Sequence, residues 1–410
     1  MNAPLIKRPF DVARVREDFP ILARSVNNRP LVYLDNAASA QKPDAVIEAM
    51  AAAMRGSYAN VHRGLHTLAN ETTTAFEAAR ETVARFINAP SPETIVFTKG
   101  GTQAINIVAA GLAIQPGDEI VVSVMEHHSN IVPWHFLRER KGAVLKWLDI
   151  DDDGRIDLDA LDALIGPRTK MVALTHMSNV LGVETPVADI VRIAHAKGVP
   201  VMLDGCQAAV HRRVDVQALD VDFYAFTGHK LYGPTGIGVL YGKRERLAAL
   251  APFEGGGEMI DIVERERVLY NDPPHRFEAG TPPIIEAIGL KAAIDWYESQ
   301  DRAAIDSHEA ALRDRAMDAL RSLNWIKLHG QAADKGAIVA FSAECAHPHD
   351  LAQILDKQGV AIRAGHHCAQ PLMQRLGVTA TARASFACYN TMEEVDVFIE
   401  ALHKARKLLS

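Results

Sequence analysis

Short apolar runs alternate with helical patterns between residues 95 and 241 of this 410-residue chain. Most of these runs are continuously apolar, which is typical of strands buried on both faces of a parallel sheet. Gly, Pro or Asp stands at nearly every junction. The alternation predicts an α/β fold with a large domain built on a seven-stranded, mainly parallel sheet covered by helices. The predicted strands are Ile95–Phe97, Glu119–Val124, Val144–Leu148, Met171–Thr175, Pro200–Asp204, Phe223–Phe226 and Ile237–Tyr241.

The pattern changes beyond this region. Residues 253–283 contain three consecutive glycines, a charged run and two Pro pairs, so we expect a long excursion outside the sheet. Amphipathic segments from 284 to 323 then lead into a smaller αβ pattern. We predict a large domain over residues 24–290 and a small C-terminal domain over 291–410, joined by segment 1–23. The elements expected in the small domain are Ala337–Phe341, a helix near Asp350–Lys357, Val360–Arg363, Ala382–Ala387 and a final helix from Met392.

Composition and charge narrow the choice of partners. The chain is 48% hydrophobic and 23% charged, as in ordinary globular proteins. The chain has 44 Lys and Arg and 51 Asp and Glu, a net charge of −7, and it has no long block of one sign. This balance argues against nucleic acid as a main partner. No apolar run reaches about 18 residues, and Met1–Asp18 lacks the apolar stretch of a signal peptide. We therefore expect a soluble, cytoplasmic protein with no membrane partner.

Polar side chains follow the predicted strands, at the edge where open α/β sheets bind ligands. The strand Ile95–Phe97 leads into Lys-Gly-Gly-Thr at 99–102 and then a helical pattern, which offers backbone N–H groups and a hydroxyl to a phosphate. An ordinary helix cap explains such a junction at least as well. His127 follows the next strand, where an imidazole can stack on a flat ligand or transfer protons. A structural histidine is an equal alternative.

The next strand ends supply an acid and an amine. Asp204 ends an apolar strand, where a carboxylate is costly unless it meets a positive partner, although a helix cap is the commoner explanation of one such Asp. The strand Phe223–Phe226 runs directly into Thr-Gly-His-Lys at 227–230, and a partly buried lysine can act as a nucleophile. Most lysines instead extend to solvent. Together, a phosphate cradle, a stacking ring, an acid and an amine match the needs of pyridoxal 5′-phosphate (PLP).

Ordered motifs along nearly the whole chain carry a family resemblance. They are Tyr33-Leu-Asp-Asn-Ala-Ala, Val61-His-Arg-Gly-Leu-His66, Asp204-Gly-Cys-Gln207, Thr227-Gly-His-Lys230, Phe277-Glu-Ala-Gly-Thr281-Pro, Arg363-Ala-Gly-His-His-Cys368-Ala, Arg383-Ala-Ser and Tyr389-Asn390. With these motifs the chain resembles the SufS-like cysteine desulfurases, which are PLP-dependent transferases of fold type I. The compact loop that ends in Cys368 resembles this group rather than relatives whose cysteine lies on a longer, Ser-rich loop.

The resemblance implies the cofactor contacts. Lys230 would be the lysine that binds PLP as a Schiff base, Asp204 the partner of the pyridinium nitrogen, and His127 the imidazole that stacks on the ring, with a possible role as proton donor. The other implied contacts are Gln207 to the ring hydroxyl, Gly101, Thr102, Thr227 and His229 to the phosphate, and Thr281 to the phosphate of the other subunit. A site shared in this way implies a homodimer.

The resemblance also implies the reaction. L-cysteine would be converted to L-alanine, with its sulfur passed to Cys368 as a persulfide and then to a SufE- or SufU-like acceptor or a scaffold for iron–sulfur cluster assembly. Asn179, Arg383 and Arg363 would bind the substrate, since a guanidinium suits a carboxylate. The cationic groups that precede Cys368 would favour its thiolate.

Two positions depart from the family pattern. Gly101 stands in the phosphate turn where relatives often have Thr or Ala, and it offers an amide but no hydroxyl. Cys206 stands where a small residue such as Ala or Ser is usual, and we expect it to pack rather than catalyse. Cys345 and Cys388 lie in apolar surroundings, which indicates core thiols.

Other functions stay open at this stage. Selenocysteine lyase activity is the close competitor, and a non-enzymatic scaffold for sulfur assembly is the rival outside catalysis. His62 and His66 have metal-ligand spacing, but no Glu follows His62 as a zincin needs and no cysteine pair completes a set, so we predict no metal site. The lack of a G-x-G-x-x-G motif after the first strand argues against a dinucleotide-dependent dehydrogenase.

Overall fold

The largest sheet has seven strands, as predicted. The computed structural model describes residues 10–344 and 346–409. The strands are β4 (Ile95–Thr98), β5 (Glu119–Ser123), β6 (Val144–Leu148), β7 (Thr169–Thr175), β8 (Val201–Asp204), β9 (Phe223–Thr227) and β10 (Gly238–Gly242). Their order is β4-β10-β9-β8-β7-β5-β6. β5 to β9 run parallel, whereas β10 is antiparallel to both of its neighbours. The sheet is therefore mainly parallel.

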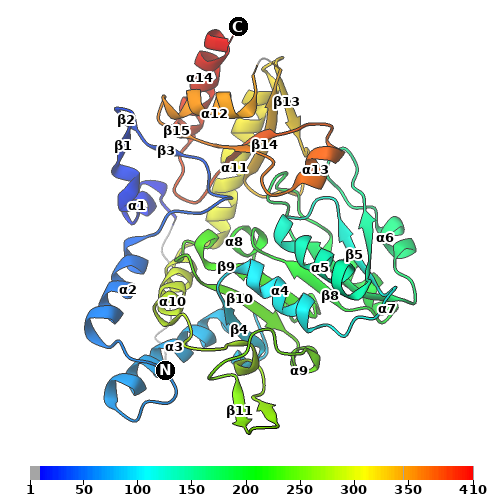
Figure 1. Ribbon diagram of the computed structural model, residues 1–410. Helices are drawn as coiled ribbons and strands as arrows, with labels where there is room; N and C mark the ends of the chain where they lie inside the picture. The colour runs from blue at the N-terminus through cyan, green and yellow to red at the C-terminus, as the bar shows by residue number, and fades with distance from the viewer. Residues whose placement is uncertain (1–9, 345, 410) are drawn as a thin grey trace.

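Helices cover both faces of this sheet (Figure 1). The α-helices of the described residues are α1 (Val12–Glu17), α2 (Asp44–Gly56), α3 (Thr67–Phe86), α4 (Gly101–Gly111), α5 (Val132–Lys141), α6 (Leu158–Leu164), α7 (Val187–Ala196), α8 (Ala208–His211), α9 (Arg244–Ala249), α10 (Ile284–Glu298), α11 (Arg302–Arg321), α12 (Pro348–Asp356), α13 (Gln370–Arg375) and α14 (Met392–Leu409). Apolar side chains of α4 and α5 pack on one face, and those of α3, α7 and α10 on the other.

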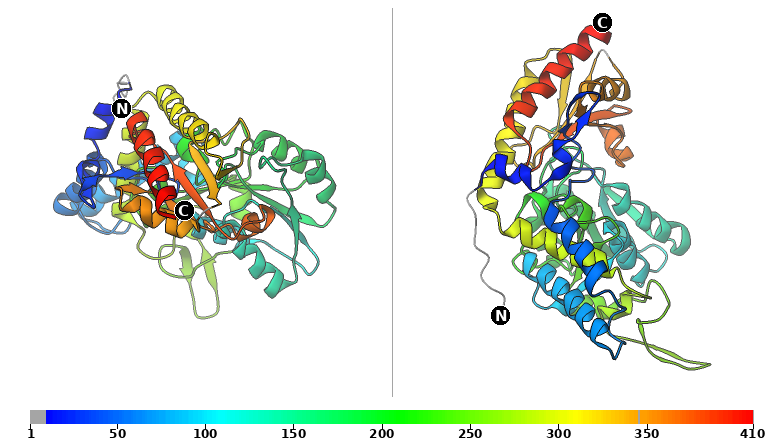
Figure 2. Two further views of the ribbon diagram at one scale, coloured as in Figure 1. Left: turned by 90° about the horizontal axis from the view of Figure 1, so that it is seen from above. Right: turned by 90° about the vertical axis from the view of Figure 1, so that its left-hand side faces the viewer.

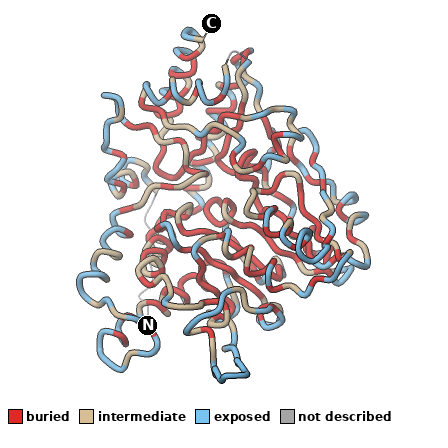
Figure 3. Tube along the Cα trace, viewed as in Figure 1, coloured by how far each residue is buried: buried red, intermediate tan, exposed pale blue. Residues whose placement is uncertain are grey.

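Burial on both faces explains the continuous apolar runs. Every residue of β4, β8, β9 and β10 is buried. β6, at one edge of the sheet, is the exception and exposes Val144 and Trp147. β4, at the other edge, is buried. Figure 3 shows the buried residues concentrated in the sheet and in the helix faces that cover it.

A second, four-stranded antiparallel sheet is built from the C-terminal part of the chain. Its order is β13 (Ile326–His329), β14 (Ile338–Ala343), β17 (Thr381–Ser385) and β16 (Arg363–Gly365). Side chains of α11, α12 and α14 pack with it around Phe341, Phe386 and Phe398. The views in Figure 2 show this unit beyond one end of the large sheet. The boundary at residues 290 and 291 stays a prediction.

The expected strand Val360–Arg363 is two strands in the structure. β15 (Val360–Ala361) pairs in parallel with β3 (Val32–Tyr33), and β16 joins the four-stranded sheet.

β13 was not predicted, because its alternating exposure leaves only a weak apolar pattern. Near the N-terminus, β1 (Ser25–Val26) and β2 (Arg29–Pro30) form a small hairpin. Residues 1–9 of the predicted N-terminal segment, and Cys345, lie outside the described residues.

The excursion expected over residues 253–283 contains an antiparallel hairpin outside both larger sheets. Its strands are β11 (Ile260–Val263) and β12 (Val268–Tyr270), and they project from the lower end of the molecule in Figure 1. Its apolar side chains Val263 and Tyr270 are exposed. Within the described part of the chain, no helix has both the length and the apolar character needed to cross a bilayer.

Candidate active site

A cavity of about 640 Å³ lies beyond the carboxyl ends of the parallel strands. Its walls come from the turns after β4, β5, β7, β8 and β9 and from the loop after β16. Every site residue predicted from the sequence lines it, apart from Thr281. These residues are Gly101, Thr102, His127, Asn179, Asp204, Gln207, Thr227, His229, Lys230, Arg363, Cys368 and Arg383. The structure therefore brings together side chains that lie up to 282 positions apart in the sequence, from 101 to 383.

One end of the cavity is suited to an anion. α4 begins at Gly101 directly after β4, so its first N–H groups and the Thr102 hydroxyl lie at the cavity wall. Thr102 Oγ1 lies 2.7 Å from Ser129 Oγ, which also lines the cavity. β10 approaches this turn closely at Gly238, where a Cβ would lie 2.4 Å from Gly100 Cα. A glycine at 238 is thus required for the turn to have this shape.

His127 presents a neutral imidazole to the cavity. Burial, reinforced by Lys230, lowers the pKa of His127 to about 4. Its Nδ1 accepts a hydrogen bond from Ser129 N–H at 3.1 Å, so the ring proton resides on Nε2. Burial also lowers the pKa of His229 to about 4, with Lys230 and Lys42 as further causes. Both rings are therefore uncharged at neutral pH.

Asp204 and Lys230 come from neighbouring strands. Asp204 is the last residue of β8, which pairs with β9, and Lys230 ends the short helix η4 (Gly228–Lys230) that follows β9. Both residues line the cavity together with His127. Cys206 lies beside Asp204, whose Oδ1 accepts from Cys206 N–H at 3.0 Å. Burial and Asp204 raise the pKa of the Cys206 thiol well above its usual value, so it is protonated.

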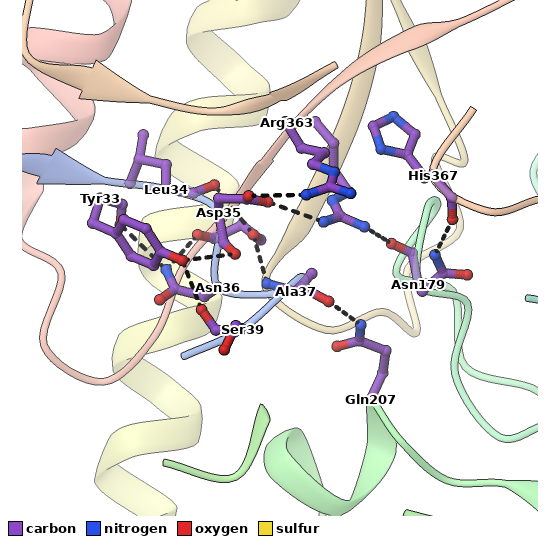
Figure 4. Close-up of polar contacts among 12 residues, drawn as sticks. Tyr33, Leu34, Asp35, Asn36, Ala37, Ser39, Asn179, Gln207, Arg363 and His367 are labelled. Carbon is purple, nitrogen blue, oxygen red and sulfur yellow. Dashed lines mark hydrogen bonds and ion pairs between the residues drawn. The ribbon is translucent and has the colours of Figure 1, made fainter. Parts of the chain in front are cut away.

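A second polar group surrounds Arg383, and Figure 4 shows its members Asp35, Asn179 and Arg363. Arg383 is buried, and its Nη1 donates to the Asn179 carbonyl at 2.6 Å while its Nη2 donates to Asp35 Oδ1 at 3.2 Å. Its Nε has no hydrogen-bond partner among the described residues. Arg363 Nη1 lies 3.7 Å from the other oxygen of Asp35. A buried cation with a free donor beside a cavity is suited to binding a carboxylate.

Sequence reasoning assigned no role to Asp35 or Ala37. Asp35 contacts both predicted substrate-binding arginines, and the Ala37 carbonyl accepts from Gln207 Nε2 at 2.7 Å (Figure 4). Both residues belong to the motif Tyr33-Leu-Asp-Asn-Ala-Ala, which supports the family resemblance but by itself indicates no role for either residue. The available signal was a carboxylate directly after a short apolar run.

Cys368 reaches the cavity on a sharply turned loop. His367 and Cys368 have φ values of 51° and 56°, in the left-handed region. Asn179 Nδ2 donates to the His367 carbonyl at 2.8 Å, and His367 Nε2 lies 2.9 Å from Thr381 Oγ1. Burial lowers the pKa of His367 to about 3, so this ring is neutral too.

The other residues singled out in the sequence lie apart from the cavity. Thr281 is exposed and does not line it. His62 Nε2 contacts Glu77 Oε1 at 2.9 Å, and His66 Nδ1 caps α3 by accepting from Ala69 N–H. Across residues 10–344 and 346–409, no three or more His, Cys, Asp or Glu side chains are grouped so that they could hold a metal ion. Cys388 is fully buried, as expected for a core thiol.

Comparison with known proteins gives the family. Residues 32–398 match the family described as Aminotransferase class-V. The chain belongs to this family. It is 50% identical over 413 residues to the cysteine desulfurase of Dickeya dadantii, with 100% of each chain covered. This membership confirms the fold type I class and the resemblance inferred from the motifs.

Solved structures agree along the whole length. The cysteine desulfurase CsdA from Escherichia coli, in an S-sulfonic acid form, has a TM-score of 0.91 at 45% identity, covering 98% of this chain and 100% of that one. The apo cysteine desulfurase of Thermococcus onnurineus has a TM-score of 0.92 at 38% identity, covering 100% and 99%. The class-V family member described here thus has full-length structural relatives that are cysteine desulfurases.

Proposed function

We propose that this protein is a PLP-dependent cysteine desulfurase that converts L-cysteine to L-alanine and takes the sulfur onto Cys368 as a persulfide. The observation that carries the proposal is that Lys230, Asp204 and Cys368, from three separate parts of the chain, line one cavity. The 50% identity to a full-length cysteine desulfurase supports the same reaction.

The residues present fit PLP. The cavity has the volume usual for a cofactor site, roughly 300 to 1,000 Å³. Gly101 and Thr102 at the start of α4, with Thr227 and His229 nearby, would hold the phosphate. When bound, PLP supplies a protonated pyridine ring that takes up the electron pair released at the substrate Cα. The Asp204 carboxylate would keep the proton on the ring nitrogen, and the neutral His127 ring would stack on the ring.

The remaining groups fit the substrate. The free Nε of buried Arg383, together with Asn179 and Arg363, would bind the cysteine carboxylate and orient the Cα–H bond. The Lys230 amine would remove the Cα proton. The Cys368 thiolate would attack the substrate sulfur, so that an S–S bond forms as the C–S bond breaks and its electron pair remains on carbon.

A homodimer is part of the proposal. Thr281 is exposed and lies outside its own cavity, which supports its use in the phosphate site of a second copy. Large apolar side chains of α2, α3 and the segment between them are also exposed, including Met54, Tyr58 and Leu65. Burying such side chains against a partner would stabilise a dimer. The acceptor would be a SufE- or SufU-like protein or an iron–sulfur scaffold, and the cytoplasmic location stays a prediction.

Two variants test the function. Lys230→Ala should lose covalently bound PLP, as seen by mass spectrometry after borohydride reduction, and should form no alanine from L-cysteine. Cys368→Ala should retain the PLP adduct but release no sulfide from L-cysteine in the presence of a reductant. Lys327→Ala, a substitution of an exposed lysine on β13, is the matched control and should behave as wild type. A wild-type protein that binds no PLP, or a Cys368→Ala variant with full sulfide release, would contradict the proposal.

A further inference from the structure

The loop that carries Cys368 has an uncommon backbone. It connects β16 to α13, and two consecutive non-glycine residues in it, His367 and Cys368, have left-handed φ values. L-residues adopt this conformation only when surrounding contacts hold it. The contacts of the loop therefore decide where the Cys368 thiol lies.

His128 contacts the loop at two points, one at the cysteine and one beyond it. Its backbone N–H donates to the Cys368 carbonyl at 2.6 Å. Its side-chain Nε2 accepts a hydrogen bond from the backbone N–H of Gln370 at 3.1 Å. His128 is thus bonded to the cysteine itself and to the second residue after it. Asn179 holds the loop from the other direction, through the His367 carbonyl.

His128 also joins the loop to the cofactor side of the cavity. It opens the short helix η3 (His128–Asn130) directly after His127, which lines the cavity. The His127 ring and the Cys368 backbone are therefore connected through one peptide unit and one hydrogen bond. A displacement of His128 would shift the loop relative to the His127 ring.

We propose that His128 is a positioning residue, which holds the Cys368 thiol in place for sulfur transfer by binding the loop through its backbone and its neutral imidazole. The inference rests on the proposed role of Cys368 as the sulfur-accepting thiol. His128 itself does not line the cavity in the described structure, so it acts through Cys368 and not on the reacting atoms.

The protonation state of the ring matters because Nε2 is an acceptor. A protonated imidazole donates at both nitrogens, so Nε2–H would face the N–H of Gln370 and the bond would be lost. The titratable groups that face His128 are His366, whose ring centroid lies 5.9 Å away, and His127, at 6.4 Å. Burial and His366 lower the pKa of His128 from its ordinary value, which favours the accepting form at neutral pH.

Two substitutions separate the hydrogen bond from the bulk of the side chain. His128→Gln places an amide oxygen where Nε2 lies and cannot titrate, whereas His128→Leu keeps the bulk and loses the acceptor. His135→Leu on α5 is the matched control, because this half-buried ring packs near Trp147, away from the cavity. The measurements are the kcat and KM for L-cysteine and the rate of Cys368 alkylation by iodoacetamide, from pH 5.5 to 8.5.

We expect His128→Leu to lower kcat by about 5- to 10-fold, as the loss of one hydrogen bond of average strength would, with KM within about twofold. Its Cys368 alkylation rate should change to a similar degree. His128→Gln should keep the wild-type kcat at neutral pH and should alkylate at a rate that no longer depends on protonation of residue 128 at acid pH.

Three results would overturn the inference. They are a wild-type kcat and alkylation rate in His128→Leu, a reduced kcat with unchanged Cys368 alkylation, and a kcat or alkylation rate of His128→Gln at pH 7.5 that differs from wild type by about fivefold or more. The last result tests the inference even if His128→Leu does not fold, because the glutamine oxygen should still accept the hydrogen bond from Gln370 N–H. Alkylation of Cys368 does not depend on turnover, so it distinguishes a failure of this inference from a failure of the desulfurase function.

Discussion

The Asp35 carboxylate lies 3.2 Å from Nη2 of the buried Arg383 guanidinium, which places an acidic group of the protein on an arginine proposed to bind the substrate carboxylate. The second Asp35 oxygen lies 3.7 Å from Arg363 Nη1. Burial raises the pKa of Asp35, whereas the two arginines counteract this shift. Asp35 therefore holds both guanidinium groups at the edge of the cavity (Figure 4).

We expect Asp35→Ala to raise KM for L-cysteine about tenfold with a smaller effect on kcat. The physical reason is the loss of a charge-assisted hydrogen bond, worth about 1.5 to 3 kcal/mol, which orients Arg383 before substrate binds. Initial-rate kinetics over a range of L-cysteine concentrations measure the effect. Asp314→Ala, an exposed carboxylate on α11, is the control. A lower KM in Asp35→Ala would mean that Asp35 competes with the substrate rather than orienting its arginine.

The two departures from the family pattern are in contact with each other. A Cβ added to Gly101 would lie 2.6 Å from Cys206 Sγ, which is closer than real side chains approach. The cysteine sulfur thus occupies space that a larger residue at 101 would need.

This contact predicts a compensating pair. Gly101→Ala should lower the free energy of unfolding by about 1 to 3 kcal/mol through overpacking. Adding Cys206→Ala should recover at least about 1 kcal/mol of that loss. Urea unfolding of the apoprotein at one protein concentration measures the cycle, and Gly56→Ala, whose Cβ meets nothing within 4 Å, is the control. Strictly additive effects of the two substitutions would show that the contact is not limiting.

Much of the site was predictable because strand ends share one edge of a sheet. Asp204, His127 and Lys230 each follow an apolar run, and the topology of a parallel sheet brings such positions together whatever their separation. The predicted bounds of β6 match the structure, and those of β8 differ by one residue. β8 is continuously buried, which gives a continuous apolar run.

The contacts missed from the sequence depend on pairings between distant segments. Asp35 reaches Arg383 because it bridges to Ser385 of β17, just after the two-residue strand β3, and so short a strand has no periodicity to detect. His127 and His128 are alike in sequence, yet one ring faces the cavity and the other accepts from Gln370. Only the backbone direction after β5 distinguishes these two roles.

Asp204→Asn tests the proposed acid partner of the cofactor. The neutral amide keeps the shape of the carboxylate but cannot stabilise a protonated pyridine nitrogen. We expect the variant to retain PLP on Lys230 and to lose about 100-fold or more of kcat for alanine formation, the scale of acid–base contributions. Asp159→Asn on the exposed side of α6 is the control. Turnover close to that of wild type would contradict the assignment.

Glu126, the buried residue that precedes His127, links stability to pH. It is fully buried, its oxygens contact Ser123 Oγ and Asn130 Nδ2 at 2.6 Å each, and burial raises its pKa from 4.5 to about 8. The folded protein therefore binds a proton there that the unfolded chain has already released between pH 4.5 and 8. Folding takes up a proton in this range, so the free energy of unfolding decreases as pH rises from 4.5. The loss of stability caused by Glu126 is complete above about pH 8.

Glu126→Gln removes this titration and keeps both hydrogen-bonding partners. We expect the variant to be more stable than wild type by about 1 to 3 kcal/mol at pH 7.5, because one pKa unit corresponds to about 1.4 kcal/mol. The difference should shrink toward zero as pH falls to 4.5, where the carboxyl is protonated in the folded state and begins to protonate in the unfolded state. Urea unfolding at several pH values measures it, with Glu139→Gln on the exposed face of α5 as control. A stability difference that does not vary with pH would mean that Glu126 is ionised in the folded protein, and the buried carboxylate would then need a cationic partner.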